Sequence, residues 1–385
     1  MSTQRSGSPL RVKRQVPVIH LVDSFGLGGC QSCLRELRKV APLNRRHFFI
    51  SLRAVSPATD IRGPFVIKHR SRSRLSLFPL FTARRLLRAT GPAIVHCHLF
   101  RAQAFGFLLK LFNPSIQLVF HERGRIYGRE HEPLWEAVLF ALLIRISRRY
   151  VDMYVANSAR TLEKMKQVGL DGRVPPMVIH NSILSKIERP NAEQRKTARI
   201  RFSIPENAFV FGFAGRIVGR KGWRDFLALA ERFAGSAEIY WMVAGEGSEW
   251  PDALRAALAS SNPRVLLVGH IREMDEFYSA IDCCVVPSHW EPHGLVQIEA
   301  HGRGIPVIAS DVPGMSETME DGVNALIYPA GDVAALYQRA TLLVDSPQTR
   351  AKLSSGGLCN AVRFSIQHYS ARLEEAYRQL LSLQL

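Results

Sequence analysis

The chain has 385 residues, 46% apolar and 22% charged, which is typical of a globular protein large enough for two domains. No apolar run reaches the roughly 18 residues of a membrane span, which excludes helical membrane spans. The net charge of +18 is unevenly placed, because residues 1–190 carry 32 Lys and Arg against 11 Asp and Glu. So basic a half predicts an anionic partner, which is a nucleic acid, an acidic membrane surface or a phosphorylated substrate; the alternative is a basic face that serves only solubility.

The first half of the chain predicts an alternation of strands and helices. Residues 1–15 are basic but lack the apolar core of a signal peptide. We therefore expect these residues to be disordered and the protein to be soluble and cytoplasmic. The expected strands are 16–22, 93–98, 117–121 and 153–157, and the expected helices are 30–41, 101–112, 133–149 and 159–168. Apolar strands separated by helices indicate a parallel sheet covered on both faces. Within the third helix, 134–147 is so apolar that we expect it to be buried.

The alternation breaks at 184–205, a polar stretch that predicts a linker and a short basic helix. It then restarts, with expected strands at 208–215, 238–245, 264–269, 282–288 and 305–310, and ends in an amphipathic helix at 364–384. Two similar α/β sheets in one chain imply a cleft between them. Ligands of such sheets bind at the carboxyl ends of the strands.

The stretch "HWEPHGLVQIEA" (289–300) places two acids, Glu291 and Glu299, around a helix that we expect to begin near Gly294. Eight helical positions span ~12 Å, against the ~5–9.5 Å between paired glycosidase carboxylates, so a cooperating acid pair is not favoured. One elongated ligand fits better, with an acid at each end and its anionic middle at the helix start. A nucleotide-sugar has this shape. The alternative is a solvated loop acid and a helix-capping acid, and this stretch alone does not decide between them.

A second stretch, "FAGRIVGRKGWRDF" (213–226), follows the first strand of the second half. It places Arg216 and Lys221 on a glycine-rich turn between strand and helix. The planar guanidinium of arginine, with its several N–H donors, and the compact ammonium of lysine both bind phosphate oxygens. The turn therefore predicts a phosphate site.

The cysteines and histidines do not predict a metal or redox centre. Cys30 and Cys33 form a CxxC at a helix start, but no second CxxC provides partners. Cys97, between His96 and His98, supplies ligands only if the fold brings these side chains together. We expect His20, His96 and His98 to be packed in the core, and likewise the cysteines of "DCCVVPS" (282–288).

Taken together, the motifs resemble those of the retaining glycosyltransferases of family 4. "AGRIVGRKG", "VAGEG", "FYSAIDCCVVPS", "EPHGLVQIEA" and "GIPVIASDVPGMSE" occur in the order and spacing of that family, with the two acids in its E-x7-E motif. The resemblance implies an α/β chain of GT-B fold: two Rossmann-like domains facing a central cleft, with a C-terminal helix crossing back to the first. We expect domains at 1–187 (acceptor side) and 188–365 (donor side), and the returning helix at 366–385.

In the second domain, the resemblance implies a role for each site residue. Glu291 would hold hydroxyls of the transferred sugar, and Glu299 those of the ribose. The donor diphosphate would meet the residues that carry cations or helix-opening amides, namely Arg216, Lys221, Gly294 and Leu295.

In the first domain, the resemblance implies a glycine-rich loop and one histidine. Gly28 and Gly29 of "SFGLGGCQ" match the loop that closes over donor and acceptor. His121 of "VFHERG" matches the histidine near the reacting sugar carbon, so Glu291 and His121 are the expected catalytic residues.

The resulting prediction is a retaining glycosyltransferase. It would move a hexose from a nucleoside-diphosphate sugar, UDP rather than GDP, to a lipid-linked or polysaccharide acceptor of the cell envelope. The absence of an Asp-x-Asp motif predicts no metal, and we expect no cofactor. The alternatives are an inactive nucleotide-sugar-binding or nucleic-acid-binding protein, or a sugar-nucleotide epimerase.

The basic clusters at 45–48, 68–74 and 83–88 suit an anionic bilayer, and 76–90 reads as a helix lying on its surface. No nucleic-acid-binding motif accompanies them. We therefore expect a peripheral protein on the inner face of the cell membrane and no nucleic-acid partner.

Overall fold

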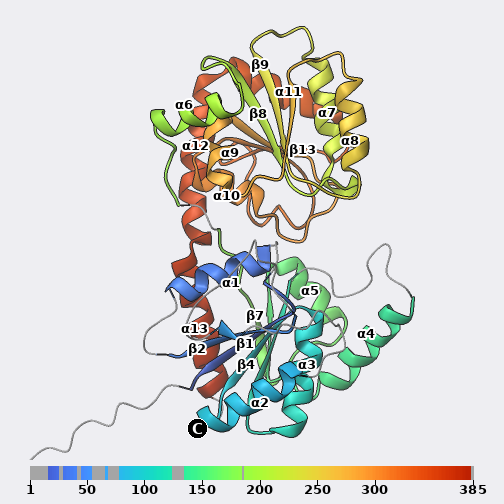
Figure 1. The fold of residues 1–385 in the computed structure, drawn as a ribbon, viewed down its shortest axis with the longest axis vertical. Helices are drawn as coiled ribbons and strands as arrows, with labels where there is room; N and C mark the ends of the chain where they lie inside the picture. The colour runs from blue at the N-terminus through green and yellow to red at the C-terminus, as the bar shows by residue number, and fades with distance from the viewer. Residues whose placement is uncertain are drawn as a thin grey trace, which may run out of the picture.

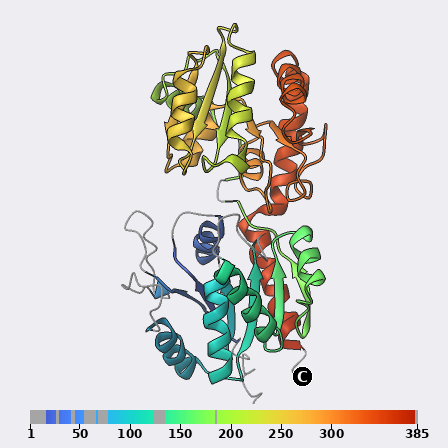
Figure 2. The same cartoon turned by 90° about the vertical axis from the view of Figure 1, so that its right-hand side faces the viewer.

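The structure is a computed structural model that describes residues 16–25, 29–40, 45–53, 66–67, 78–123, 134–183 and 186–382. Two α/β units lie one above the other along the long axis of the molecule, and the final helices run down one side past both (Figures 1 and 2). The expected segment 1–15 and the basic cluster 68–74 lie outside the described residues.

The first sheet is parallel and seven-stranded, in the order β3-β2-β1-β4-β5-β6-β7. Its strands are β1 (Val18–Val22), β2 (His47–Ser51), β3 (Val66–Ile67), β4 (Ile94–His98), β5 (Gln117–Glu122), β6 (Met153–Ala156) and β7 (Val174–Val178). The four expected strands are confirmed, and β2, β3 and β7 are additional. The last two are edge strands; β3 has two residues and β7 contains two prolines, which edges tolerate.

Helices cover both faces of this sheet. They are α1 (Gly29–Val40), α2 (Phe78–Thr90), α3 (Phe100–Phe112), α4 (Leu134–Ser147) and α5 (Ala159–Gln167). Buried side chains of α2 to α5 pack on one face, and those of α1 pack on the other. The sheet is thus buried on both sides, which explains why its strands are apolar throughout.

The expectation that 134–147 is a buried helix is wrong. This segment forms α4, but Val138, Leu142 and Ile146 are about half exposed, at 60%, 51% and 47%. Ile144, in contrast, packs into the core. The helix lies on the outside of the layer, with these three apolar side chains turned toward solvent.

The second sheet is parallel and six-stranded, in the order β10-β9-β8-β11-β12-β13. Its strands are β8 (Phe209–Ala214), β9 (Ile239–Ala244), β10 (Val265–Gly269), β11 (Cys283–Val286), β12 (Val307–Ser310) and β13 (Leu326–Tyr328). The five expected strands are confirmed, with β13 added at the edge. Its helices are α6 (Ala192–Arg201), α7 (Trp223–Arg232), α8 (Trp250–Leu258), α9 (Met274–Ala280), α10 (Val296–Gly302), α11 (Val333–Asp345) and α12 (Pro347–Ala361).

The short basic helix expected in the linker is α6, but it belongs to the packing of the second unit. Ala198 lies in the core beside α9, and Arg199 is buried against Asp282 at 2.7 Å. Arg195 reaches the same carboxylate at 2.6 Å. Two of its basic residues therefore anchor the helix instead of facing solvent.

The chain finally returns to the first sheet through α13 (Ile366–Ser382). Tyr369, Leu373 and Tyr377 of this helix are buried in a cluster that includes residues of α1, and Figure 1 shows α13 running along the first unit. The two parallel Rossmann-like units and the returning helix form a GT-B fold. Among the helices that the structure describes, none combines the length and hydropathy needed to cross a membrane.

Candidate functional site

The carboxyl ends of the two sheets face each other. Gly29, just beyond β1, lies so close to Leu295, beyond β11, that a Cβ on the glycine would collide with the leucine side chain. A second contact joins Glu317, beyond β12, to the start of α5. Its carboxylate accepts hydrogen bonds from the backbone N–H of Ala159 at 2.7 Å and of Arg160 at 2.9 Å. The expected site between the sheets therefore lies where both sets of strands end.

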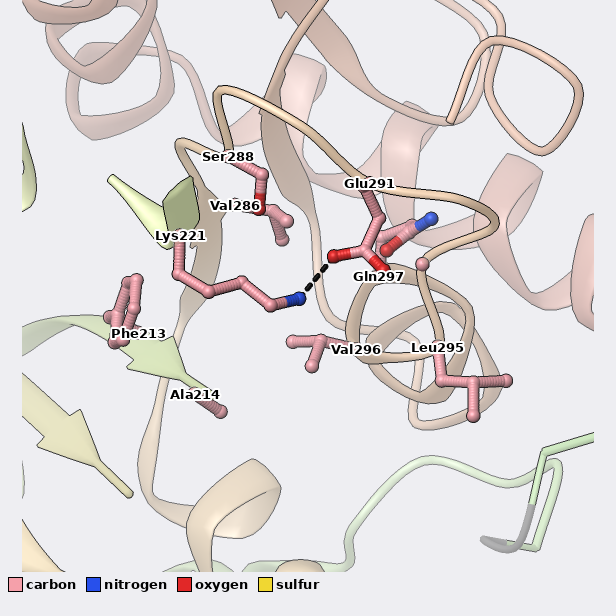
Figure 3. A pocket seen from close by; sticks show the side chains of 10 residues that line it. Phe213, Ala214, Lys221, Val286, Ser288, Glu291, Leu295, Val296 and Gln297 are labelled. Carbon is pink, nitrogen blue, oxygen red and sulfur yellow. Dashed lines mark hydrogen bonds and ion pairs between the residues drawn. The ribbon is translucent and has the colours of Figure 1, made fainter. Parts of the chain in front are cut away.

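A pocket opens at this junction on the second unit, at the ends of β8 and β11 and the start of α10 (Figure 3). Its lining residues are Phe213, Ala214, Lys221, Val286, Ser288, Glu291, Gly294, Leu295, Val296 and Gln297. Among these lining residues only Lys221 and Glu291 are charged. Their side chains point toward each other and form an ion pair (Figure 3).

The glycine-rich turn directs Lys221 into the pocket. Residues 219–221 form a single 3-10 turn, η2 (Gly219–Lys221), which ends at Gly222 with φ of 69°. This left-handed conformation favours glycine, and any side chain there would collide with the carbonyl of Pro287. The backbone N–H of His289 donates to the carbonyl of Arg220 at 2.9 Å. The turn and the loop that carries Glu291 are therefore fastened together.

Arg216 does not join this pocket. It follows β8 on the same glycine-rich segment, but its side chain is exposed and is not among the lining residues. No ion pair or hydrogen bond ties it to another described side chain. Of the two cations expected at the phosphates, Lys221 lines the pocket and Arg216 does not.

The two acids of the E-x7-E motif have different surroundings. Glu299 lies inside α10, where its Oε2 accepts a hydrogen bond from the hydroxyl of Tyr278 at 2.9 Å. Burial raises the pKa of Glu299 to about 7, although this hydrogen bond opposes the rise. Glu291 instead lines the pocket, and Glu299 does not. The two acids therefore differ in position, since Glu291 lines the pocket and Glu299 is bonded to Tyr278 inside α10.

The start of α10 lies at the pocket as expected. Gly294 has φ of 68°, and Leu295 is the residue before the first helical turn. The first N–H groups of any helix lack intrahelical partners. They are hydrogen-bond donors available at the pocket, next to Lys221.

In the first unit, Gly28 lies outside the described residues, and Gly29 begins α1. His121 is the second-last residue of β5, at the end of the strand that faces the junction, and its side chain is fully buried. Burial, followed by the nearby charge of Arg123, lowers the pKa of His121 well below its ordinary value, so the ring is neutral. Its Nε2 has no hydrogen-bond partner.

Sequence reasoning missed the residue that organises this region, Arg123. Its Nη2 lies 3.3 Å from Nδ1 of His98. Nε2 of His98 is 3.0 Å from Nδ1 of His20, and Nε2 of His20 is 3.0 Å from Nδ1 of His47. Arginine can only donate, so His98 and His20 each accept through Nδ1 and donate through Nε2, and His47 accepts through Nδ1. The row ends near Glu374 of α13, 3.6 Å from Nε2 of His47.

A second row of hydrogen bonds also ends at Arg123. The hydroxyl of Tyr377 lies 2.7 Å from Nδ1 of His96, and Nε2 of His96 lies 3.2 Å from Nδ1 of His121. Nη2 of Arg123 lies 3.5 Å from the same Nδ1. Because this nitrogen accepts, Nε2 of His121 carries the proton and is a free donor. The only sequence signal for these rows is the position of His98 and His121 near the ends of two strands.

Three histidines of these rows, His20, His96 and His98, are buried with ligand atoms within 4.8 Å of one another, close enough to hold a metal ion. Their ring nitrogens already serve the hydrogen bonds described above, and the Arg123 guanidinium beside them repels a second cation. Burial is the main cause that lowers the pKa of each ring. Cys97 points to the opposite face of the sheet, where it packs against Gly106. Hydrogen-bonded packing describes this group better than a metal centre.

Comparison with known proteins gives two family matches. Residues 40–183 match the model described as Glycosyltransferase Family 4, and residues 208–346 match the one described as Glycosyl transferases group 1. The two regions contain the first sheet from β2 to β7 and the whole second sheet.

Curated relatives carry glycosyltransferase names. The D-inositol 3-phosphate glycosyltransferase of Nocardioides sp. is 31% identical over 250 residues, 59% of this chain and 54% of that protein. The lipopolysaccharide core biosynthesis mannosyltransferase LpsB of Rhizobium meliloti is 28% identical over 243 residues, 60% of this chain and 67% of that protein. The matched part of the chain thus spans about half the length of the first of these relatives.

Solved structures share the fold over the whole molecule. Anabaena HepE in complex with UDP-glucose is 18% identical, with a TM-score of 0.77 over 94% of this chain and 100% of that one. The lipopolysaccharide outer core galactosyltransferase WaaB has a TM-score of 0.64 at 15% identity, over 96% and 100%. The two family matches, the named relatives and the shared GT-B fold together show that the chain belongs to the glycosyltransferases described as family 4 and group 1.

Proposed function

We propose that the protein is a retaining, metal-independent glycosyltransferase. It moves a hexose from a nucleoside-diphosphate sugar, a UDP-sugar in preference to a GDP-sugar, to a lipid-linked or polysaccharide acceptor of the cell envelope. In this proposal residues 1–187 form the acceptor side, residues 188–365 form the donor side, and 366–385 tie the two together. No cofactor takes part.

The observation that carries the proposal is the pairing of Lys221 with Glu291 at a pocket rimmed by the first N–H groups of α10. A cation and backbone donors suit a diphosphate, and a carboxylate beside them suits sugar hydroxyls. The acceptor hydroxyl attacks the reacting carbon of the donor sugar on the same face from which the diphosphate leaves. A phosphate oxygen of the leaving group takes the proton of that hydroxyl. The protein positions the reactants and stabilises charge on the leaving diphosphate.

Each expected site residue keeps its role in this proposal. Glu291 holds the transferred sugar, and His121 donates from its free Nε2–H to a sugar oxygen. The diphosphate and ribose meet the remaining donor-side residues, Arg216, Lys221, Gly294, Leu295 and Glu299. Gly28 and Gly29 close over the ligand from the first unit, where Gly29 already touches Leu295.

The acceptor side is proposed to dock on an anionic membrane. On α2, Phe78 and Phe81 are each 65% exposed, and Arg85 and Arg88 continue the same exposed stripe. On α4, the exposed Val138, Leu142 and Ile146 lie next to exposed arginines, at positions 145, 148 and 149. Both helices pack against α3. Apolar side chains bordered by arginines are what a helix lying in an anionic interface presents.

Names of relatives support the acceptor class. One is named for inositol 3-phosphate, another for the lipopolysaccharide core. Both names point to acceptors that are phosphorylated or belong to the cell envelope.

The test is thermal unfolding of the purified protein with UDP-, GDP- and ADP-sugars. A rise in melting temperature with UDP-sugars, together with slow release of UDP, is the expected result. No shift with any nucleotide-sugar would contradict the proposal.

A further inference from the structure

Among the residues that the structure describes, no carboxylate forms an ion pair with Arg123. Its Nη1 donates to Oδ1 of Asn181, and its Nη2 donates to the Tyr369 hydroxyl at 2.7 Å and more distantly to His98 and His121. All four partners are neutral. Its neighbour Glu122 faces the other side of the sheet, where it accepts a hydrogen bond from Gln103 at 2.7 Å.

The most deeply buried cations of the described chain are treated differently. Each lies within ion-pair distance of a carboxylate: Arg45 of Glu374, Lys110 of Asp152, Arg199 of Asp282, and Arg303 of Asp275. A cation held out of water without a counter-ion is destabilising. Arg123 is half-buried and differs from these four in having only neutral partners among the described residues.

Two donors in this region are also unused. Nε of Arg123 and Nε2 of His121 are both buried and have no hydrogen-bond partner within the described part of the chain. They belong to residues two apart at the end of β5, where the two units meet. A net positive charge and two free N–H groups call for a ligand that only accepts hydrogen bonds and carries negative charge.

The field of Arg123 extends to the donor side. Burial is the main cause that lowers the pKa of His293 to about 3, with smaller effects from neighbouring groups that include His180 and Arg123. His293 directly precedes Gly294 of the pocket. Asn181, the partner of Arg123, lies between His180 and Ser182 in the segment that leads from the first unit to the second.

We propose that Arg123 binds an anionic oxygen group, a phosphoryl or a carboxylate, of a ligand held between the two units. The ligand is one of the two substrates, so the inference rests on the proposed function. The group comes either from the donor diphosphate or from an acidic acceptor. In both cases the ligand supplies the counter-ion that the protein lacks.

The test compares the wild type with Arg123→Met by calorimetry, using UDP, uridine, and inorganic phosphate added to UDP-saturated protein at constant ionic strength. If the donor supplies the anion, the variant binds UDP about tenfold or more weakly but uridine equally. If the acceptor supplies it, UDP binding is unchanged, and phosphate binding to the UDP-saturated wild type is lost in the variant. Unchanged binding of both UDP and phosphate overturns the proposal.

Arg173→Met is the matched control. Arg173 precedes β7, at the amino ends of the strands and so opposite to Arg123, and pairs with Asp152 at 3.2 Å. This substitution should leave all three affinities unchanged. If the wild type binds no nucleotide but binds phosphate through Arg123, the proposed donor fails while the anion site stands.

Asn181→Asp keeps the test decisive should Arg123→Met not fold. It places a carboxylate where the amide oxygen now accepts from Arg123, and so supplies an internal counter-ion. The expected result is a higher melting temperature without ligand and anion binding about tenfold weaker. Anion binding as tight as in the wild type would contradict the inference.

Discussion

The ammonium group of Lys221 and the carboxylate of Glu291 form an ion pair between the glycine-rich turn and the loop after β11 (Figure 3). Both side chains are mostly buried, with 16% and 11% exposed. In the proposed donor complex a phosphate competes for the ammonium, and sugar hydroxyls satisfy the carboxylate. The pair thus holds both groups in place before the donor arrives.

Lys221→Ala should lower the rate of UDP release from a UDP-sugar by about tenfold or more, about 1.4 kcal/mol in activation free energy. The reason is the loss of a cation beside the leaving diphosphate. Arg224→Ala is the control, since Arg224 is on the next turn and pairs with Glu249 away from the pocket. Steady-state kinetics that are normal for Lys221→Ala would remove this residue from the phosphate site.

Arg216→Ala tests whether the exposed arginine swings toward the ligand. If it does, as the resemblance implies, turnover should also fall by about tenfold with the melting temperature unchanged, since no described partner is lost. Kinetics equal to the wild type would leave Lys221 as the cation of the site.

Glu299→Gln should make the protein more stable than the wild type above pH 7. The pKa of this carboxyl is raised by burial from 4.5 to about 7, so between these values the unfolded chain loses the proton while the folded protein keeps it. Wild-type stability therefore falls as pH rises through this window, by up to about 3 kcal/mol. Glutamine does not titrate, and its advantage should disappear below pH 4.5.

Glu317→Gln should change the stability of the protein in the opposite direction. Burial acts to raise the pKa of Glu317, but hydrogen bonds from His180 and from the backbone of Ala159 and Arg160 outweigh it and lower the pKa. This substitution should destabilise the protein at neutral pH, with a smaller effect in acid. Melting temperatures between pH 4 and pH 8 measure both variants, and parallel profiles would contradict the account.

Docking on a membrane should depend on α2. We expect cosedimentation with vesicles that contain anionic lipid, little with neutral vesicles, and release at high salt as the Debye length falls from ~10 Å at 0.1 M to ~3 Å at 1 M. Arg85→Glu with Arg88→Glu should abolish binding and leave UDP affinity unchanged. Reversing the charges of Arg201 and Arg255, which are exposed on the second unit, should not change binding to vesicles. Equal binding to neutral vesicles would argue against an electrostatic membrane site.

Activity should survive excess chelator. The proposed mechanism stabilises the diphosphate with Lys221 and helix-opening N–H groups, and the buried histidines are occupied by hydrogen bonds to one another. Loss of activity with EDTA, restored by a divalent ion, would show that a metal supplies the missing charge.

The sequence predicts the sheets well because their strands are apolar throughout, and it predicts the Glu291 loop and the Lys221 turn because both follow recognisable strands. It cannot predict the pairing of Lys221 with Glu291, which depends on how closely Gly222 approaches Pro287. The anchoring of α6 through Arg195 and Arg199 and the exposed apolar side chains of α4 also depend on tertiary packing, which composition does not reveal.

The role of Arg123 illustrates the same limit. His20, His47, His96, His98 and His121 come from four strands, and only the register of the sheet brings their rings into two hydrogen-bonded rows. A single sequence does not contain that register. That the partners of Arg123 among the described residues are all neutral is likewise visible only once the side chains are placed.

The most direct test of the central claim is the rate at which UDP is released from a UDP-sugar by the wild type, Glu291→Gln and Lys221→Ala, each checked for folding by circular dichroism. The account predicts that the wild type releases UDP and that both folded variants are slower by about tenfold or more. A wild type that releases no UDP while binding the nucleotide-sugar would identify an inactive binding protein. Equal rates in all three proteins would place the chemistry elsewhere.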